Sequence, residues 1–164
     1  RTRAIKSLFE AAGIPVDVTT DIDGWLKYHV ALVSPLVNAL YKHGCDNYAL
    51  GGDTKTLQAM VRAAKEGGTV LKALGYTKRQ PFQFNLFYWL PRWLESPVFS
   101  KLFNSRSAEV RFGLHAPGVV PELFEMAEEF AELKAEAEME TPTLDSLLAC
   151  LPRPAATHRK EKTS

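Results

Sequence analysis

Apolar side chains recur along this chain at the spacing of α-helices, and no stretch of useful length alternates apolar and polar residues as a strand would. Helices are expected over six ranges that glycine or proline residues separate: 2–12, about 23–43, about 53–73, 97–114, 121–138 and 142–151. The short β-branched segment 16–20 is expected to be an extended connection. The pattern predicts an all-α fold, a bundle of roughly six to eight helices that forms one domain over residues 1–151.

Individual residues set the expected ends of these helices. Either Asp21 or Asp23 can cap the second one, because a carboxylate accepts hydrogen bonds from the free N–H groups of the first turn. Gly44 is expected to end the same helix. Within the third range, the adjacent Gly67 and Gly68 offer a break, since glycine lowers helix stability.

Two of the helices have expected inner faces. In the range 97–114, Val98, Leu102 and Val110 recur at helical spacing, with Phe103 as a further inward candidate. In the range 121–138 the apolar side carries four residues: Leu123, Met126, Phe130 and Leu133. The rest of that helix is densely charged and is interpreted as a solvated face.

The segment 82–93 concentrates aromatic side chains. It contains six of them: Phe82, Phe84, Phe87, Tyr88, Trp89 and Trp93. One small helix cannot easily bury so many rings. Two arrangements are therefore open: other helices cover the segment, or it contacts a second chain or a further domain.

Composition and charge mainly exclude classes of protein. The 164 residues carry a formal net charge of +1, which argues against a protein dedicated to nucleic acid. No apolar run is long enough to span a membrane, and no signal peptide begins the chain. Cys45 and Cys150 lack the spacing of a metal or redox pair, so a reducing compartment, the cytoplasm, is expected. The histidines are too scattered to predict a metal site: His29, His43, His115 and His158.

Two further stretches carry no chemistry by themselves. The glycine pairs 51–52 and 67–68 lack the spacing and the preceding strand of a phosphate-binding loop. The tail 152–164 has too few apolar side chains to pack and is predicted to be disordered.

The helix expected at about 23–43 is almost wholly apolar or aromatic, yet it carries three polar residues at spacings of seven and four: Lys27, Ser34 and Asn38. Such spacings place them along one strip of the helix. An ammonium on such a helix either keeps its head in water at the rim or is placed for chemistry. The role of Lys27 therefore decides whether the chain belongs to an enzyme.

The residues around Lys27 resemble a known family. Seven of them match its pattern of a Gly-Ile-x-Val link that leads into Asp-Ile and Trp-x-Lys: Gly13, Ile14, Val16, Asp21, Ile22, Trp25 and Lys27. Later in the chain, Glu122 stands twenty residues before Pro142, which opens the last helix. On these residues the chain resembles the C-terminal helical domain of the ketopantoate reductase (2-dehydropantoate 2-reductase) family, as a divergent member.

The resemblance implies a fold like the C-terminal domain of 6-phosphogluconate dehydrogenase and an NADP-dependent oxidoreductase that reduces a 2-oxo acid. Lys27 would be the catalytic lysine at the substrate carbonyl. Glu122 would bind a substrate hydroxyl, with Glu125 as the alternative. NADPH would be bound mainly by an N-terminal Rossmann domain that this chain lacks, so no cofactor and no activity are expected of the chain alone.

The substrate contacts depart from the family pattern. Ala31 and Pro35 stand where the family has asparagines, and Val110 stands where it has a serine. Ser34, Asn38 and Ser107 are the nearest candidates for substrate binding: each lies close to one of those positions. A 2-oxo acid other than ketopantoate is therefore expected.

Lys27 suits such a reaction because a cation near the carbonyl oxygen stabilises the charge that develops as hydride arrives. Partial burial is expected to lower its pKa toward a range useful for proton donation. A different class of function stays open: a non-catalytic helical module that dimerises or binds a partner through the segment 82–93. A third interpretation is a helical protein that binds a small molecule in an apolar pocket lined by that segment.

Overall fold

The computed structural model describes residues 2–78 and 82–151, and the predicted tail 152–164 lies outside them. Every regular element in the described ranges is helical, so the all-α expectation is confirmed. Nine α-helices occur there, more than the expected six to eight: α1 (Thr2–Ala11), α2 (Ile22–Lys42), α3 (Asn47–Gly52), α4 (Thr54–Ala73), α5 (Leu86–Trp89), α6 (Arg92–Phe103), α7 (Arg106–Ala108), α8 (Val120–Glu136) and α9 (Pro142–Leu148). The surplus arises because α5 and α7 are only four and three residues long.

Three further turns complete the described secondary structure: the 3₁₀ turns η1 (Phe82–Asn85) and η3 (Ala116–Gly118) and the π-helical turn η2 (Glu109–Gly113). None of the helices among the described residues combines the length and the apolar content that crossing a bilayer requires.

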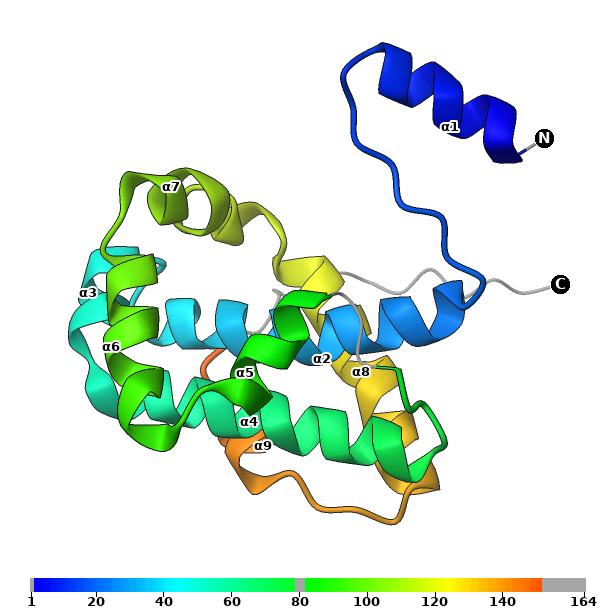
Figure 1. Ribbon diagram of the computed structural model, residues 1–164. Coiled ribbons are helices and arrows are strands. Elements are labelled where there is room, and N and C mark those ends of the chain that lie inside the picture. The colour runs from blue at the N-terminus through cyan, green and yellow to red at the C-terminus, as the bar shows by residue number, and fades with distance from the viewer. Residues whose placement is uncertain (1, 79–81, 152–164) are drawn as a thin grey trace, which may run out of the picture.

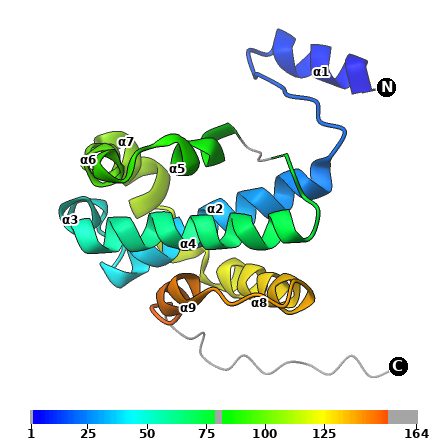
Figure 2. The ribbon, with the colours of Figure 1, turned by 60° about the horizontal axis from the view of Figure 1, so that its bottom comes forward.

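Helices α2 and α4 lie side by side at the centre of the molecule (Figure 1). Turned as in Figure 2, α5, α6 and α7 lie on one side of α4, and α8 and α9 lie on the other. The buried core forms two clusters, and each of them combines residues from α2, α4 and α8. One buried cluster surrounds Leu40, Met60 and Phe103, and the other surrounds Tyr28, Phe84 and Phe130.

Aspartates begin the two central helices. Asp21 caps α2, because its Oδ1 accepts a hydrogen bond from the Gly24 N–H at 3.0 Å. The alternative cap, Asp23, lies inside the first turn instead. Asp53 caps α4 through the N–H groups of Lys55 and Thr56, at 3.0 and 3.1 Å.

The glycine pair does not break α4, so that expectation is wrong. Gly67 and Gly68 are both buried, and the helix runs through them. A Cβ on Gly67 would lie 3.2 Å from the Ala31 Cβ and 3.3 Å from the ring of Phe130. The glycines therefore let α2, α8 and the aromatic segment approach the backbone of α4, and tertiary packing outweighs their low helix propensity.

The helix expected over 97–114 is also different. It begins earlier, at Arg92, and ends at Phe103, where the Asn104 side chain donates to the Ser100 carbonyl at 3.0 Å. Its inner face carries Phe99 and Phe103 rather than Leu102, which is 41% exposed. Beyond it, Val110 lies outside α6 and is 56% exposed.

The aromatic segment divides between its two expected arrangements. Phe84 and Phe87 are buried in the two core clusters. Phe82, Trp89 and Trp93 are 70%, 62% and 74% exposed. Other helices thus cover half of the segment, and the other half is an apolar surface on η1, α5 and α6.

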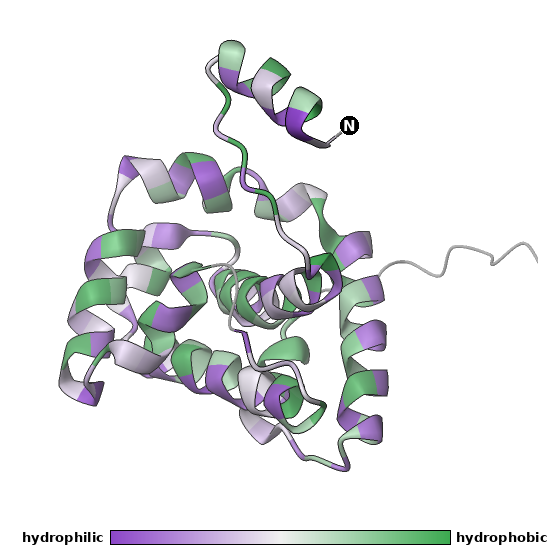
Figure 3. Ribbon diagram, turned by 45° about the vertical axis from the view of Figure 1, so that its right-hand side comes forward, coloured by the Kyte–Doolittle hydropathy of each residue, from purple (hydrophilic) through white to green (hydrophobic). Residues whose placement is uncertain are grey.

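Helix α1 forms as expected but contributes no buried residue to the bundle. It stands apart at the end of an extended connection (Figure 3). Its apolar side is accordingly exposed: Ile5 by 51%, Leu8 by 70% and Phe9 by 45%. Because an amphipathic helix gains stability by burying one side, this surface is suited to a partner.

The role of Gly68 gives a stability prediction. A Cβ there would overlap the Tyr88 hydroxyl and lie 2.9 Å from the Phe84 ring. Overpacking costs about 1–3 kcal/mol, more than the gain of about 1 kcal/mol from replacing glycine in a helix. We expect Gly68→Ala to lower the urea midpoint of unfolding.

Gly52→Ala is the control, because a Cβ at Gly52 meets no atom within 4 Å. Its midpoint should stay unchanged or rise slightly. A Gly68→Ala protein as stable as Gly52→Ala would show that close packing does not explain this glycine.

Candidate functional site

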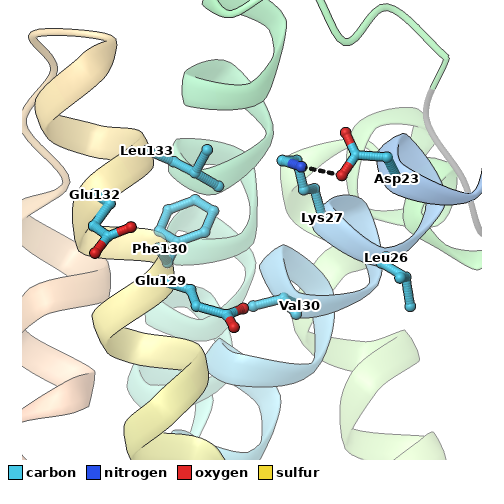
Figure 4. Close-up of a pocket in the computed structure, with 8 residues that line it drawn as sticks. All are labelled: Asp23, Leu26, Lys27, Val30, Glu129, Phe130, Glu132 and Leu133. Atoms are coloured by element: carbon cyan, nitrogen blue, oxygen red, sulfur yellow. Dashed lines mark hydrogen bonds and ion pairs between the residues drawn. The ribbon is translucent and has the colours of Figure 1, made fainter. Parts of the chain in front are cut away.

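Lys27 lies in a pocket between α2 and α8 with a volume of about 400 Å³ (Figure 4). The two helices line it with carboxylates and apolar side chains around the one ammonium: Asp23, Leu26, Lys27, Val30, Glu129, Phe130, Glu132 and Leu133. Of the residues predicted for a site, the pocket contains Lys27 alone.

The pocket follows from the direction in which α8 packs. Near the start of α8, the Tyr41 hydroxyl donates to the Ala116 carbonyl, which ties this region to the C-terminal part of α2. Later in α8, Phe130 packs with Tyr28 and Ala31 in one core cluster. The two helices therefore run antiparallel, and the second half of α8 lies beside the first turns of α2.

An interaction network holds the Lys27 side chain, which is 24% exposed. Its ammonium donates a hydrogen bond to Asp23 one turn earlier, and the Tyr76 hydroxyl donates to the other carboxylate oxygen of Asp23 at 2.9 Å. The ammonium also lies 5.1 Å from the centre of the Tyr76 ring, within reach of a cation–π contact. Tyr28 secures this loop by donating to the Tyr76 carbonyl at 2.6 Å.

These contacts decide the protonation of the pair. The hydrogen bond with Asp23 raises the pKa of Lys27, and the opposing effect of desolvation is smaller. The same bond, helped by the Tyr76 hydroxyl, lowers the pKa of Asp23. The expected downward shift of the Lys27 pKa is therefore wrong: the residue is a fixed cation at neutral pH. Of its three N–H donors, Asp23 takes one.

Two carboxylates lie on the α8 side of the pocket, beside apolar side chains. Glu129 extends from α8 toward Val30 of α2, and Glu132 lies one turn further along α8 (Figure 4). Together with Asp23 they give the pocket three negative groups and one positive group. The site therefore favours a ligand that offers hydrogen-bond donors to Glu129 and one acceptor to Lys27.

The predicted glutamate lies elsewhere. Glu122 is in the first turn of α8, seven residues before Glu129, which corresponds to about 10 Å along the helix axis. Glu125, the alternative, is one turn before Glu129 and is likewise exposed. Since α8 runs antiparallel to α2, its beginning is the end distant from Lys27.

The predicted substrate contacts are also apart from Lys27. Ser34 and Asn38 are 6% and 0% exposed, and the Asn38 amide donates to the Ser34 hydroxyl at 3.3 Å inside the core. Ser107 is exposed on α7. The Asn47 amide fixes the chain just before α7 by donating to the Phe103 carbonyl at 2.7 Å, beyond the C-terminal end of α2. The structure thus does not bring these residues together, and their roles stay predictions.

Three residues of the site were not predicted from the sequence: Asp23, Tyr76 and Glu129. The spacing of four between Asp23 and Lys27 was a usable signal, because such residues meet on a helix. Nothing local marked Tyr76, which comes from the loop after α4. Glu129 was hidden in a run of glutamates, and only the packing of α8 selects it.

Among residues 2–78 and 82–151, no group of three or more histidine, cysteine, aspartate or glutamate side chains is arranged to hold a metal ion. The chemistry available at the pocket is that of one ammonium ion, three carboxylates and a phenol.

Replacing Asp23 tests the network. Asp23→Asn should lower the pKa of Lys27, measured from the pH dependence of its side-chain NMR signals, because the carboxylate is the main cause of the upward shift. Tyr76→Phe keeps the ring and should lower it less. An unchanged Lys27 pKa in Asp23→Asn would refute the pairing.

In the native protein, the pair stabilises the fold at neutral pH. That contribution fades as pH falls below about 4, because the folded-state pKa of Asp23 lies below its unfolded value.

Comparisons of the chain with protein-family models, with curated proteins and with solved structures find no match in any of the three. The resemblance to the ketopantoate reductase family, carried by the residues from Gly13 to Lys27 and by Glu122 with Pro142, therefore stays a prediction. Function has to be argued from the pocket and the surfaces around it.

Proposed function

We propose that this chain is the substrate-binding and catalytic-lysine domain of an NADPH-dependent reductase for a 2-oxo acid, resembling the ketopantoate reductases, and that it acts together with a Rossmann domain. The observation that carries the proposal is the position of Lys27. Its ammonium is held by Asp23 and Tyr76 at the edge of an open pocket of about 400 Å³.

The chemistry follows from the fixed charge of Lys27. As the carbonyl carbon of the substrate is reduced, its oxygen gains an electron pair, and a nearby ammonium stabilises that charge. The oxygen then takes a proton from Nζ, and solvent returns one to the amine. The raised pKa of Lys27 supports this role, because the residue stays protonated until an alkoxide forms.

The carboxylates of the pocket restrict which substrates can bind. Glu129 and Glu132 repel a second anionic group placed on the α8 side. They favour a substrate that carries a hydroxyl on that side and directs its carboxylate toward solvent or toward the other domain. In this proposal Glu129 binds the substrate hydroxyl, a role that the resemblance gave to Glu122. Glu122 lies in the first turn of α8, about two turns before Glu129 and away from the pocket.

The cofactor belongs to the other domain. The described residues contain no strand, whereas a Rossmann domain binds a dinucleotide at a glycine-rich turn between a strand and a helix, so the proposal assigns NADPH to a Rossmann domain. The nicotinamide, bound by a Rossmann domain, supplies the hydride. Apolar side chains exposed at the N-terminal end of the bundle support contact with such a domain: Ile14, Val18, Ile22 and Leu26.

Activity of the two-domain protein tests the role of Lys27. With this chain placed behind its natural upstream region, NADPH oxidation is measured with a panel of 2-oxo acids that differ in hydroxyl substitution. We expect Lys27→Ala to lower kcat by about a hundredfold or more, the usual contribution of a general acid.

Lys55→Ala is the matched control, because Lys55 is an exposed lysine on α4. Both variants should keep the helical circular dichroism of the native protein. Equal activity of Lys27→Ala and native protein would remove the catalytic assignment, and no oxidation with any 2-oxo acid would remove the substrate class.

A second candidate function is a helical module that dimerises without chemistry of its own. The observation that favours it is the apolar surface formed by Phe82, Leu86, Trp89 and Trp93, which are 70%, 37%, 62% and 74% exposed. The rings of Phe82 and Trp89 already pack edge to face, with centroids 5.3 Å apart. Exposed tryptophans of this kind are frequent anchors of protein interfaces.

Light scattering at tens of micromolar tests this candidate. The module predicts a dimer that becomes a monomer when Trp89 and Trp93 are both replaced by serine. Tyr48→Ser, which changes a 45% exposed ring on α3, should leave the dimer intact. A native chain that is strictly monomeric would exclude dimerisation through this surface.

A further inference from the structure

A second polar cavity, of about 390 Å³, lies between α4 and α6. Five residues line it: Gln58, Arg62, Lys65, Arg92 and Glu95. In Figure 2, α6 and α8 lie on opposite sides of α4, so this cavity is separate from the Lys27 pocket. Nothing in the proposed reductase chemistry uses it.

The spacing on α4 brings these groups together. Gln58, Arg62 and Lys65 are four and three residues apart and therefore share one side of the helix. The first turn of α6 supplies Arg92 and Glu95 opposite them. The packing of α4 on α6, rather than any local motif, makes the cluster.

One ion pair in the cavity is already complete. Glu95 is only 5% exposed and accepts a hydrogen bond from the Lys65 ammonium at 2.5 Å. The pair neutralises the buried carboxylate, as burial of a charge requires. It also fixes the lysine, whose remaining N–H donors are left for another acceptor.

The two arginines are different. Arg62 and Arg92 are exposed, and neither forms an ion pair within the part of the chain that the structure describes. After Lys65 and Glu95 cancel, the cavity keeps a surplus of two positive charges. Guanidinium groups bind phosphate and carboxylate through paired N–H donors, which an ammonium cannot do.

The cavity also has room beyond one anionic group. A neighbouring hollow of about 310 Å³ shares Arg62 and Lys65 with it. The hollow extends along α4 to Thr69 and also contains Glu66 and Glu140, whose carboxylates repel a second anionic group, so the ester group placed there has to be uncharged or cationic. A phosphate monoester carries about −1.5 to −2 at neutral pH, close to the surplus of two cations, whereas a monocarboxylate carries only one charge. The ester group would occupy the adjoining hollow.

We propose that the cavity between α4 and α6 binds a small phosphate monoester, with Arg62 and Arg92 holding the phosphate from two helices and Lys65 completing its contacts. The proposal does not depend on the reductase function. It rests on the convergence of unpaired guanidinium groups in a cavity of ligand size.

Titration of the isotopically labelled chain with phenyl phosphate, followed by ¹H–¹⁵N NMR at constant ionic strength, tests the site. Benzoate is the matched carboxylate, and inorganic phosphate tests the contribution of the ester group. We expect saturable shifts centred on residues 58–65 and 92–95, with phenyl phosphate binding at least about tenfold more tightly than benzoate.

Arg62→Gln and Arg92→Gln should each weaken phenyl phosphate about tenfold or more, because each removes a charge-assisted hydrogen bond. Arg111→Gln changes an exposed arginine outside the cavity and should leave the affinity unchanged. The site is refuted if binding does not saturate or if neither cavity variant weakens it. Benzoate binding as tightly as phenyl phosphate, or equal weakening by Arg111→Gln, would overturn it as well.

Discussion

The close approach of three elements to the glycine pair of α4 is the constraint on which the rest of the structure depends. Gly67 admits Ala31 of α2 and Phe130 of α8, and Gly68 admits the rings of Phe84 and Tyr88. Side chains larger than hydrogen at these positions would separate the layers. The Lys27 pocket lies at a border that this packing sets, between α2 and α8.

The cationic side chains of the two pockets differ in whether a carboxylate pairs with them. Lys27 and Lys65 are each tied to a carboxylate, Asp23 and Glu95 respectively, and are thereby held in place. For Lys27 the partner also raises the pKa, so the side chain is protonated at neutral pH instead of having the lowered pKa expected from burial. Arg62 and Arg92 have no such partner among the described residues, so their charge stays available to a ligand.

Features of the fold that depend on residues close together in the sequence were predicted well. Asp21 and Asp53 begin the central helices through hydrogen bonds to N–H groups two or three residues later, which sequence spacing reveals. The apolar side of α8, marked by Leu123 and Phe130, was likewise readable from helical periodicity. The helix break expected at Gly67 is wrong, because glycine favours a break only when its own propensity is considered and packing is not.

The sequence by itself determined that the chain is helical, where its two central helices begin, and that Lys27 lies on an apolar helix. The tertiary structure alone decided which groups share a site with Lys27. Glu129 lines the same pocket as Lys27 and Glu122 does not, because α8 runs antiparallel to α2. Tyr76 reaches it from the loop after α4. Contacts between residues so distant along the chain cannot be predicted from the periodicity of the sequence, because they depend on how whole helices pack.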